Sequence, residues 1–205
     1  MEQATDLNLI FMADSTTNLR SEVSDKLVER GFRRVDRMHL LRVDKDWSFW
    51  VDTGPIGKSA DISPFVGIRH DGLEVMRSEL MGLPHDESVG SLGANAGYIL
   101  NEGYRHWKAE SKSVEVLGCI DRALDRLKPL MDLKKINEGW KIQGATTPGW
   151  QYSEIIVYYL LGQEGLVLEK LRMAQAVFCK RDDGVCEQFK SFEKRLLAKM
   201  DSTRY

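Results

Sequence analysis

The sequence lacks an excess of charge of either sign. Its 29 Lys and Arg residues nearly balance 31 Asp and Glu residues, which leaves a net charge of −2. Proteins dedicated to nucleic acids or membrane surfaces usually carry a larger excess of one sign. A charged partner is therefore expected to meet a local patch, and nucleic acid is not an expected partner.

Long apolar runs are also missing. The apolar stretch at residues 9–13 is too short for the core of a signal peptide, and no basic residues precede it. No run approaches the roughly 20 residues that a membrane-spanning helix needs. We therefore expect a cytoplasmic protein that does not associate with membranes.

Cysteine is scarce, and its spacing matches no metal-binding or disulfide framework. The three cysteines are Cys119, Cys179 and Cys186. Free thiols are the expected state in a reducing cytosol. Cys119 lies between apolar residues of a predicted helix and is expected in the core.

Motifs for nucleotide binding and acyl transfer are absent. The segment Gly57-Lys58-Ser59 lacks the first glycine of a phosphate-binding loop, because Asp52 occupies that position. The glycines at 90, 93 and 97 have the wrong spacing for a dinucleotide fingerprint, and no Gly-x-Ser-x-Gly elbow occurs. We predict no catalytic residues and no cofactor.

Histidine–aspartate pairs are the remaining candidates for metal chemistry. His70-Asp71 ends a predicted strand, and His85-Asp86 lies in a predicted loop. Neither pair shows the spacing of known metal ligands, so we predict no metal site. A metal-dependent hydrolase or nuclease that uses these four residues is kept as an alternative function.

The pattern of apolar residues predicts an α+β fold over residues 1–205, with an N-terminal helix, an antiparallel sheet of about three or more strands and a helical C-terminal half. Residues 102–110 are the junction if the helical half is a separate unit. The expected elements are helices at 19–30 and 73–83, strands at 35–43, 46–52 and 62–70, loops at 84–97 and 137–150, and helices at 111–131, 155–161, 166–178 and 186–200.

Charge is unevenly distributed along the chain. Residues 59–102 hold seven acidic side chains against two basic ones, whereas residues 31–42 hold four arginines against one aspartate. Complementary charge mainly sets the specificity and rate of association, and tryptophan is favoured at interface anchors. The residues predicted to bind a partner are Asp71, Glu74, Asp86, Glu87 and Trp107. A solvated surface is the competing interpretation of the charge pattern.

Residues 27–67 resemble small α+β immunity proteins of polymorphic and contact-dependent bacterial toxin systems. The resemblance rests on an opening helix, Arg30-Gly31-Phe32-Arg33, the segment Trp47-Ser48-Phe49-Trp50-Val51, and Pro64-Phe65-Val66-Gly67. It implies a non-enzymatic protein that blocks a toxin domain. Because contact residues vary in such families, the resemblance carries no functional residue over to this chain.

The sequence therefore predicts a non-enzymatic binding protein with a protein partner, such as the toxin that it neutralises. A nucleic-acid-binding module that uses Arg33, Arg34 and Arg37 is a further alternative, and it would show steep salt dependence of binding. The sequence makes no prediction of the oligomeric state.

Overall fold

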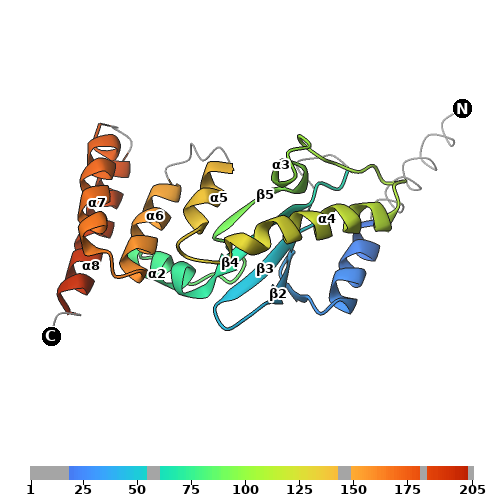
Figure 1. Ribbon diagram of the computed structural model, residues 1–205, viewed down its shortest axis with the longest axis horizontal. Coiled ribbons are helices and arrows are strands. Elements are labelled where there is room, and N and C mark those ends of the chain that lie inside the picture. The colour runs from blue at the N-terminus through green and yellow to red at the C-terminus, as the bar shows by residue number, and fades with distance from the viewer. Residues whose placement is uncertain (1–18, 55–60, 143–148, 181–183, 203–205) are drawn as a thin grey trace, which may run out of the picture. The chain divides into compact units, whose positions relative to one another are not determined.

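The computed structural model describes residues 19–54, 61–142, 149–180 and 184–202 (Figure 1). The predicted α+β class is confirmed, with an antiparallel sheet and a helical C-terminal half. The chain divides into two compact units. Unit 1 comprises residues 1–70 and 90–143, and unit 2 comprises residues 71–89 and 144–205. Residues 102–110 lie within unit 1, so they are not the boundary between these units.

Unit 1 contains a five-stranded antiparallel sheet in the order β1-β2-β3-β4-β5. Each strand pairs with its neighbour in the sequence, so the sheet is a meander. Alternate residues along each strand point to opposite faces. The strands are β1 (Arg33–Val35), β2 (Met38–Arg42), β3 (Trp47–Asp52), β4 (Phe65–His70) and β5 (Leu92–Asn95).

A helix over residues 19–29 packs on one face of this sheet. Leu19, Val23 and Leu27 are at most 3% exposed, which confirms the predicted apolar stripe. Gly31 follows with φ +92°, the left-handed conformation expected after a helix end. The hydroxyl Oγ of Ser24 lies 2.7 Å from His39 Nε2 on β2, so this helix covers the face that carries His39.

The helix α4 (Ser113–Leu127) lies beside helix 19–29 and packs on β4 (Figure 1). An ion pair of 2.7 Å joins Arg30 to Asp121, and Ser113 Oγ donates a hydrogen bond of 2.6 Å to Glu22. Cys119 is buried and free, as predicted. Pro129 lies in the 3₁₀ helix η1 (Lys128–Leu130), which ends the α-helical pattern.

Three expectations about unit 1 were wrong. Residues 35–43 are not one strand: β1 and β2 form a hairpin whose turn holds Asp36 at φ +53°. The expected loop at 84–97 contains β5, and the expected loop at 137–150 contains part of α5 (Ile136–Ile142). These strands and helices are short, so their periodic signals were too weak to read.

Three glycines on and near β4 and β5 have a packing role. A Cβ atom on Gly67, Gly90 or Gly93 would lie 2.0–2.4 Å from the indole of Trp50. The indole Nε1 donates a hydrogen bond of 3.3 Å to the carbonyl of Ile68. Glycine in a strand often marks such a close approach, and here three glycines form the floor on which Trp50 lies.

Unit 2 is helical in its described part. Its helices are α2 (Asp71–Met81), α6 (Gly149–Leu160), α7 (Glu164–Phe178) and α8 (Val185–Ser202). The predicted break between two helices is confirmed at residues 161–163, where Gly162 adopts φ +69°, whereas Glu164 and Gly165, which were expected in the break, begin α7. The helix α2 contacts α6 and α8, and α7 contacts the same two helices.

Aromatic side chains fill the core of unit 2. The ring of Tyr152 stacks on Phe178 at 5.2 Å and meets Phe192 edge-on at 4.8 Å, and Phe189 lies 5.2 Å from Phe178. All four side chains are at most 4% exposed. Burial raises the pKa of the Tyr152 phenol. These rings account for much of the apolar contact among the helices of this unit.

The prediction of free thiols was wrong for two of the three cysteines. Cys179 and Cys186 form a disulfide bond, with their Cα atoms 4.5 Å apart. Cys179 caps the end of α7, and Cys186 lies in the first turn of α8. The sequence showed only a separation of seven residues, which the helix ends bring into bonding range.

Within the described residues, no helix is long and apolar enough to cross a membrane.

Candidate functional site

A buried asparagine fixes the backbone that follows β5. Asn95 is fully buried, and its Oδ1 accepts hydrogen bonds from the amides of Gly97 (3.0 Å) and Arg105 (2.9 Å). Its Nδ2 donates to Ser63 Oγ (2.9 Å) and to the Arg105 carbonyl (2.8 Å). The hydrogen bond from the Gly97 amide to Asn95 Oδ1 also caps the N-terminal end of α3 (Ala96–Ile99). The side-chain amide of Asn95 therefore fixes the position of α3 relative to residue 105.

Residues 101–107 pack tightly against α3. A Cβ atom on Gly97 would lie 2.1 Å from the carbonyl oxygen of Gly103 and 2.4 Å from Arg105 Cγ. Asn101 and Gly103 adopt positive φ values of 60° and 76°. Trp107 pairs with Ile62 through two backbone hydrogen bonds of 2.8 Å. The segment is thus held at both ends and in the middle, although it contains no regular helix or strand.

Three aromatic rings project from this fixed backbone into solvent. Tyr98 is 52% exposed and Tyr104 is 43% exposed, and their ring centroids lie 6.0 Å apart. The ring of His106 lies 6.1 Å from that of Tyr104, and its side chain is 49% exposed. We call these three residues the aromatic surface.

Charged groups border the aromatic surface. His106 Nε2 lies 3.7 Å from Asp61 Oδ2. Glu102 Oε1 lies 2.8 Å from Arg122 Nη1 of α4, and Glu102 Oε2 lies 3.3 Å from Arg105 Nη2. The hydrogen bond from Arg122 lowers the pKa of the Glu102 carboxyl, so this group is ionised at neutral pH. An apolar centre with a charged rim is the usual composition of a protein interface.

Other exposed apolar residues of the described chain form a less specific pattern. In unit 1, Val28, Val43 and Val114 are exposed on three separate segments of the chain. In unit 2, α7 exposes Leu166, Met173 and Val177, which recur at helical spacing. Single exposed aliphatic residues are normal, whereas adjacent tyrosines are enriched at binding sites. The aromatic surface is therefore the stronger candidate.

The acidic residues predicted to bind a partner have different environments. Glu74 is 1% exposed, and its Oε2 lies 3.2 Å from Arg77, so a partner could not reach it in this conformation. Asp71 begins α2 and is partly buried. Asp86 and Glu87 are exposed in the segment after α2, and Asp86 Oδ1 accepts two hydrogen bonds from Ser88. All four belong to unit 2.

Trp107, the fifth predicted residue, lies at the end of the segment that carries the aromatic surface. It is partly exposed, and its backbone is fixed by Ile62. Residues 104–107 alternate: Tyr104 and His106 contact each other, whereas Arg105 packs toward Gly97. Trp107 therefore adjoins the aromatic surface but is not one of its three residues.

Arginines near β1 and β2 make local contacts. Arg37 Nε lies 3.4 Å from Asp52, Arg34 Nε donates to the Asp36 carbonyl, and Arg42 Nη1 donates to the Lys45 carbonyl. These contacts hold the two hairpins of the sheet. These arginines thus contact neighbouring residues of the sheet and its turns, and their contacts add no support for a nucleic-acid-binding module.

Histidines do not gather into a metal centre. No group of three or more His, Cys, Asp or Glu side chains within the described part of the chain could hold a metal ion. His70 is buried and packs edge-on against Trp47 at 4.7 Å, and its amide donates to Ser91 Oγ. His85 is exposed in unit 2. The segment Gly57-Lys58-Ser59 lies outside the described residues.

A serine–histidine pair is present in the core of unit 1. Ser24 and His39 are 8% and 2% exposed, and their hydrogen bond is 2.7 Å long. Burial lowers the pKa of His39. The backbone of Val51 opposes this shift, and smaller contributions come from Arg34, which lowers the pKa, and from Asp52, which raises it. A nucleophile needs access to a substrate, and this pair lies inside the fold. Its role is to satisfy two buried polar groups.

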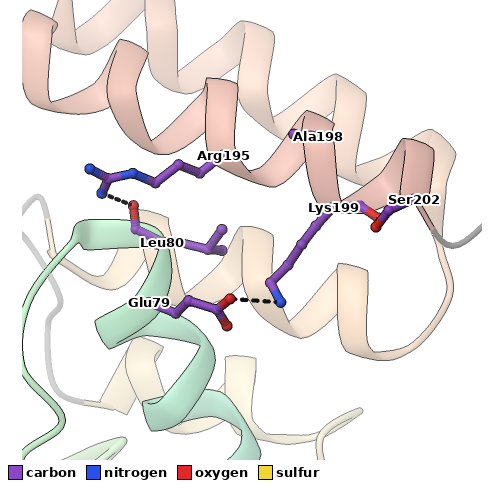
Figure 2. A pocket seen from close by; sticks show the side chains of 6 residues that line it. All are labelled: Glu79, Leu80, Arg195, Ala198, Lys199 and Ser202. Carbon is purple, nitrogen blue, oxygen red and sulfur yellow. Dashed lines mark hydrogen bonds and ion pairs between the residues drawn. The ribbon is translucent and has the colours of Figure 1, made fainter.

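A shallow pocket of about 330 Å³ lies between α2 and α8 in unit 2 (Figure 2). Arg195 Nη1 donates a hydrogen bond of 2.9 Å to the Leu80 carbonyl, and Lys199 Nζ lies 2.9 Å from Glu79 Oε1. Cations are favoured at the C-terminal end of a helix. Both cations therefore bind groups of α2, and we interpret the pocket as a gap in the packing of these two helices.

No protein-family model, curated protein or solved structure matches this chain.

The residues of the aromatic surface had a weak signal in the sequence. Tyr104 and His106 are two residues apart, so an extended segment would place both side chains on one face. The link to Tyr98 depends on Asn95, which contacts Arg105 ten positions further along the chain, and on Gly97, which packs against Gly103 and Arg105. Such a contact cannot be read from spacing alone.

Proposed function

We propose that this chain is a non-enzymatic protein-binding protein and that it binds its partner through Tyr98, Tyr104 and His106. The observation that carries the proposal is the presence of three adjacent, half-exposed rings on a backbone fixed by Asn95. Tyrosine offers a large contact area with few rotatable bonds, so little conformational entropy is lost on binding. A fixed backbone lowers that cost further.

Contact among the rings does not by itself explain their arrangement. Ring pairs at such distances add about 0.5–1.5 kcal/mol when they are well packed, and less when water reaches them. The backbone of residues 101–107 is already held by Asn95, Gly97 and Ile62. The exposed rings are therefore not needed to order the segment, which favours a role in binding.

The more specific form of the proposal is an immunity protein that neutralises a bacterial toxin. Its support is the resemblance of residues 27–67 to such proteins, and the aromatic surface fits a protein that blocks another protein. Asp86 and Glu87 are exposed and remain proposed contacts for a basic region of the partner. Charges at an interface rim change the association rate more than the affinity.

The first test is affinity purification from the native host with three forms of the chain. The forms are the wild type, the triple variant Tyr98→Ser/Tyr104→Ser/His106→Ser, and the control Leu166→Ser/Met173→Ser/Val177→Ser. The control removes exposed apolar area from α7 in unit 2. Circular dichroism and thermal unfolding establish that all forms are folded.

We expect a stoichiometric protein to co-purify with the wild type and the control and to be lost from the aromatic variant. Titration of the purified partner should then show a loss of about 30-fold or more, since a hot-spot residue contributes about 2 kcal/mol. Equal affinity for all three forms would contradict the proposed site. Absence of any stoichiometric protein partner would contradict the proposed function.

A second test addresses the acidic residues. The variant Asp86→Lys/Glu87→Lys should lower the association rate and change its salt dependence, with a smaller effect on dissociation. The control is the single charge reversal Glu187→Lys, at an exposed acidic position of α8. An unchanged association rate would contradict the proposed contacts of Asp86 and Glu87, which belong to unit 2 and are tested separately from the aromatic surface of unit 1.

A further inference from the structure

The disulfide of unit 2 joins the ends of two successive helices. Cys179 is the last, capping residue of α7 and is exposed. Cys186 is in the first turn of α8 and is partly exposed. The sulfur atoms are bonded to each other, and Cys119 of unit 1 is buried and free. The bond is thus accessible to a reagent that cannot reach the remaining thiol.

The two sulfur atoms differ in their electrostatic surroundings. The N-terminus of a helix carries a partial positive charge, and its free amides favour a thiolate. Cys186 occupies such a position in α8, which is 18 residues long. Cys179 lies at the opposite, negative end of α7. In thiol–disulfide exchange the sulfur that forms the more stable thiolate leaves faster, so Cys186 is the favoured leaving group.

Each cysteine adjoins an aromatic residue of the core of unit 2. Phe178 directly precedes Cys179, and Phe189 follows Cys186 by one helical turn. The two rings are 5.2 Å apart, and both side chains are at most 1% exposed. The disulfide therefore holds together the helix ends that bring these rings into contact.

We propose that Cys179–Cys186 is a thiol–disulfide exchange site that reacts with a dithiol. A thiolate of the dithiol attacks Cys179 Sγ, forms a mixed disulfide and expels Cys186 as a thiolate. The second thiol of the reductant then attacks its own bonded sulfur and releases Cys179. Two electrons pass from the dithiol to this chain: the dithiol becomes a disulfide, and Cys179 and Cys186 become thiols. The proposal is independent of the proposed function.

The consequence for the fold is a looser junction between α7 and α8. Reduction removes the covalent constraint and leaves the aromatic contacts in place. We expect the amides near Phe178 and Phe189 to exchange with solvent at least tenfold faster, while amides of the sheet in unit 1 keep their rates. The oxidised and reduced chains thus differ locally in unit 2.

The test uses the purified full-length chain without denaturant. The chain is treated with dithiothreitol as the dithiol probe, then alkylated, and the modified cysteines are mapped by mass spectrometry. We expect alkylation of Cys179 and Cys186 and none of Cys119, whose pKa is raised by burial. A short exposure to reduced glutathione, followed by acid quenching, should place the first adduct on Cys179.

Three outcomes would overturn the proposal. They are a chain whose Cys179 and Cys186 are already free after purification under air, a disulfide that resists excess dithiothreitol in the folded state, and a glutathione adduct found first on Cys186. Hydrogen exchange tests the looser junction between α7 and α8. The variant Cys179→Ser/Cys186→Ser should show the fast exchange of the reduced chain both with and without dithiothreitol. Unchanged exchange on reduction of the wild type would contradict the looser junction.

Discussion

Unit 1 and unit 2 hold their interiors together by different means. Of the twelve buried polar or charged residues in the described chain, ten lie in unit 1. Several of them make specific hydrogen bonds, as Asn95 does with Arg105 and Ser24 does with His39. Unit 2 instead buries four contacting aromatic rings and adds a disulfide.

This difference has a structural consequence. Hydrogen bonds are directional, so a buried polar network fixes one backbone arrangement and gives the exposed segment at 101–107 a defined shape. Aromatic packing is less directional and supplies stability across several helices. Unit 1 is therefore the better support for a binding surface, whereas unit 2 depends on packing and on its covalent link.

Removal of an aromatic ring from unit 2 should have the largest effect on stability. For Phe189→Ala we expect a loss of about 3–5 kcal/mol in the free energy of unfolding, because a large buried side chain is replaced by a cavity. The control Met173→Ala changes an exposed side chain of the same unit and should cost less than about 0.5 kcal/mol. Urea denaturation measures both. A loss below about 1 kcal/mol for Phe189→Ala would show that the aromatic core is not the main support of unit 2.

Removal of the central amide from unit 1 should rank second. Asn95→Ala deletes four hydrogen bonds and leaves buried partners unsatisfied, so we expect a loss of about 3 kcal/mol. The matched control is Asn101→Gly at an exposed position with φ 60°, where glycine is favoured and the change should be within about 0.5 kcal/mol. Equal stability of the two variants would contradict a fixing role for Asn95.

Loss of the disulfide should have a smaller effect than either of these changes. The bond closes a short loop, with a sequence separation of 7, for which the chain-entropy model gives about 2.5 kcal/mol. Thermal unfolding of Cys179→Ser/Cys186→Ser measures the change, and Cys119→Ala is the comparison in unit 1. A double variant as stable as the wild type would mean that aromatic packing alone determines the stability of unit 2.

The serine–histidine pair should produce the smallest effect and a dependence on pH. His39 has a lowered pKa because it is buried, so the unfolded chain binds its proton more readily than the folded chain. The stability that neutral His39 provides is present above pH 6.5 and is lost as the pH falls from that value toward the lowered pKa. His39→Gln should reduce this pH dependence, and Ser24→Ala should cost about 1 kcal/mol. Urea denaturation at pH 5 and 7.5 checks both, and an unchanged pH dependence in His39→Gln would contradict the assignment.

The sequence predicted the long, strongly patterned elements well. Helix 19–29, the β2–β3 hairpin, α4, α7 and α8 follow clear apolar periodicity, and their buried faces are the expected ones. It failed for β1, β5 and α5, which contain 3, 4 and 7 residues. Elements this short are stabilised by their neighbours more than by local pattern.

The candidate site could be read from the sequence only to the extent that Trp107 adjoins it. Tyr98, Tyr104 and His106 are brought together by Asn95, whose bonds to Ser63 and Arg105 span 32 and 10 residues. The burial of Glu74 could not be foreseen either, because acidic residues on a helix are usually solvated. Both failures concern polar side chains in the interior, where hydrophobic pattern carries no information.

The most direct test of the account is site-specific photo-crosslinking in the native host. A photoreactive phenylalanine derivative replaces Tyr104 of the aromatic surface in one chain and Met173 of α7 in another. The account predicts a covalent adduct with one protein from position 104 and none from position 173. Adducts from position 173 with none from position 104 would contradict it, because the partner would then contact α7 and not the aromatic surface.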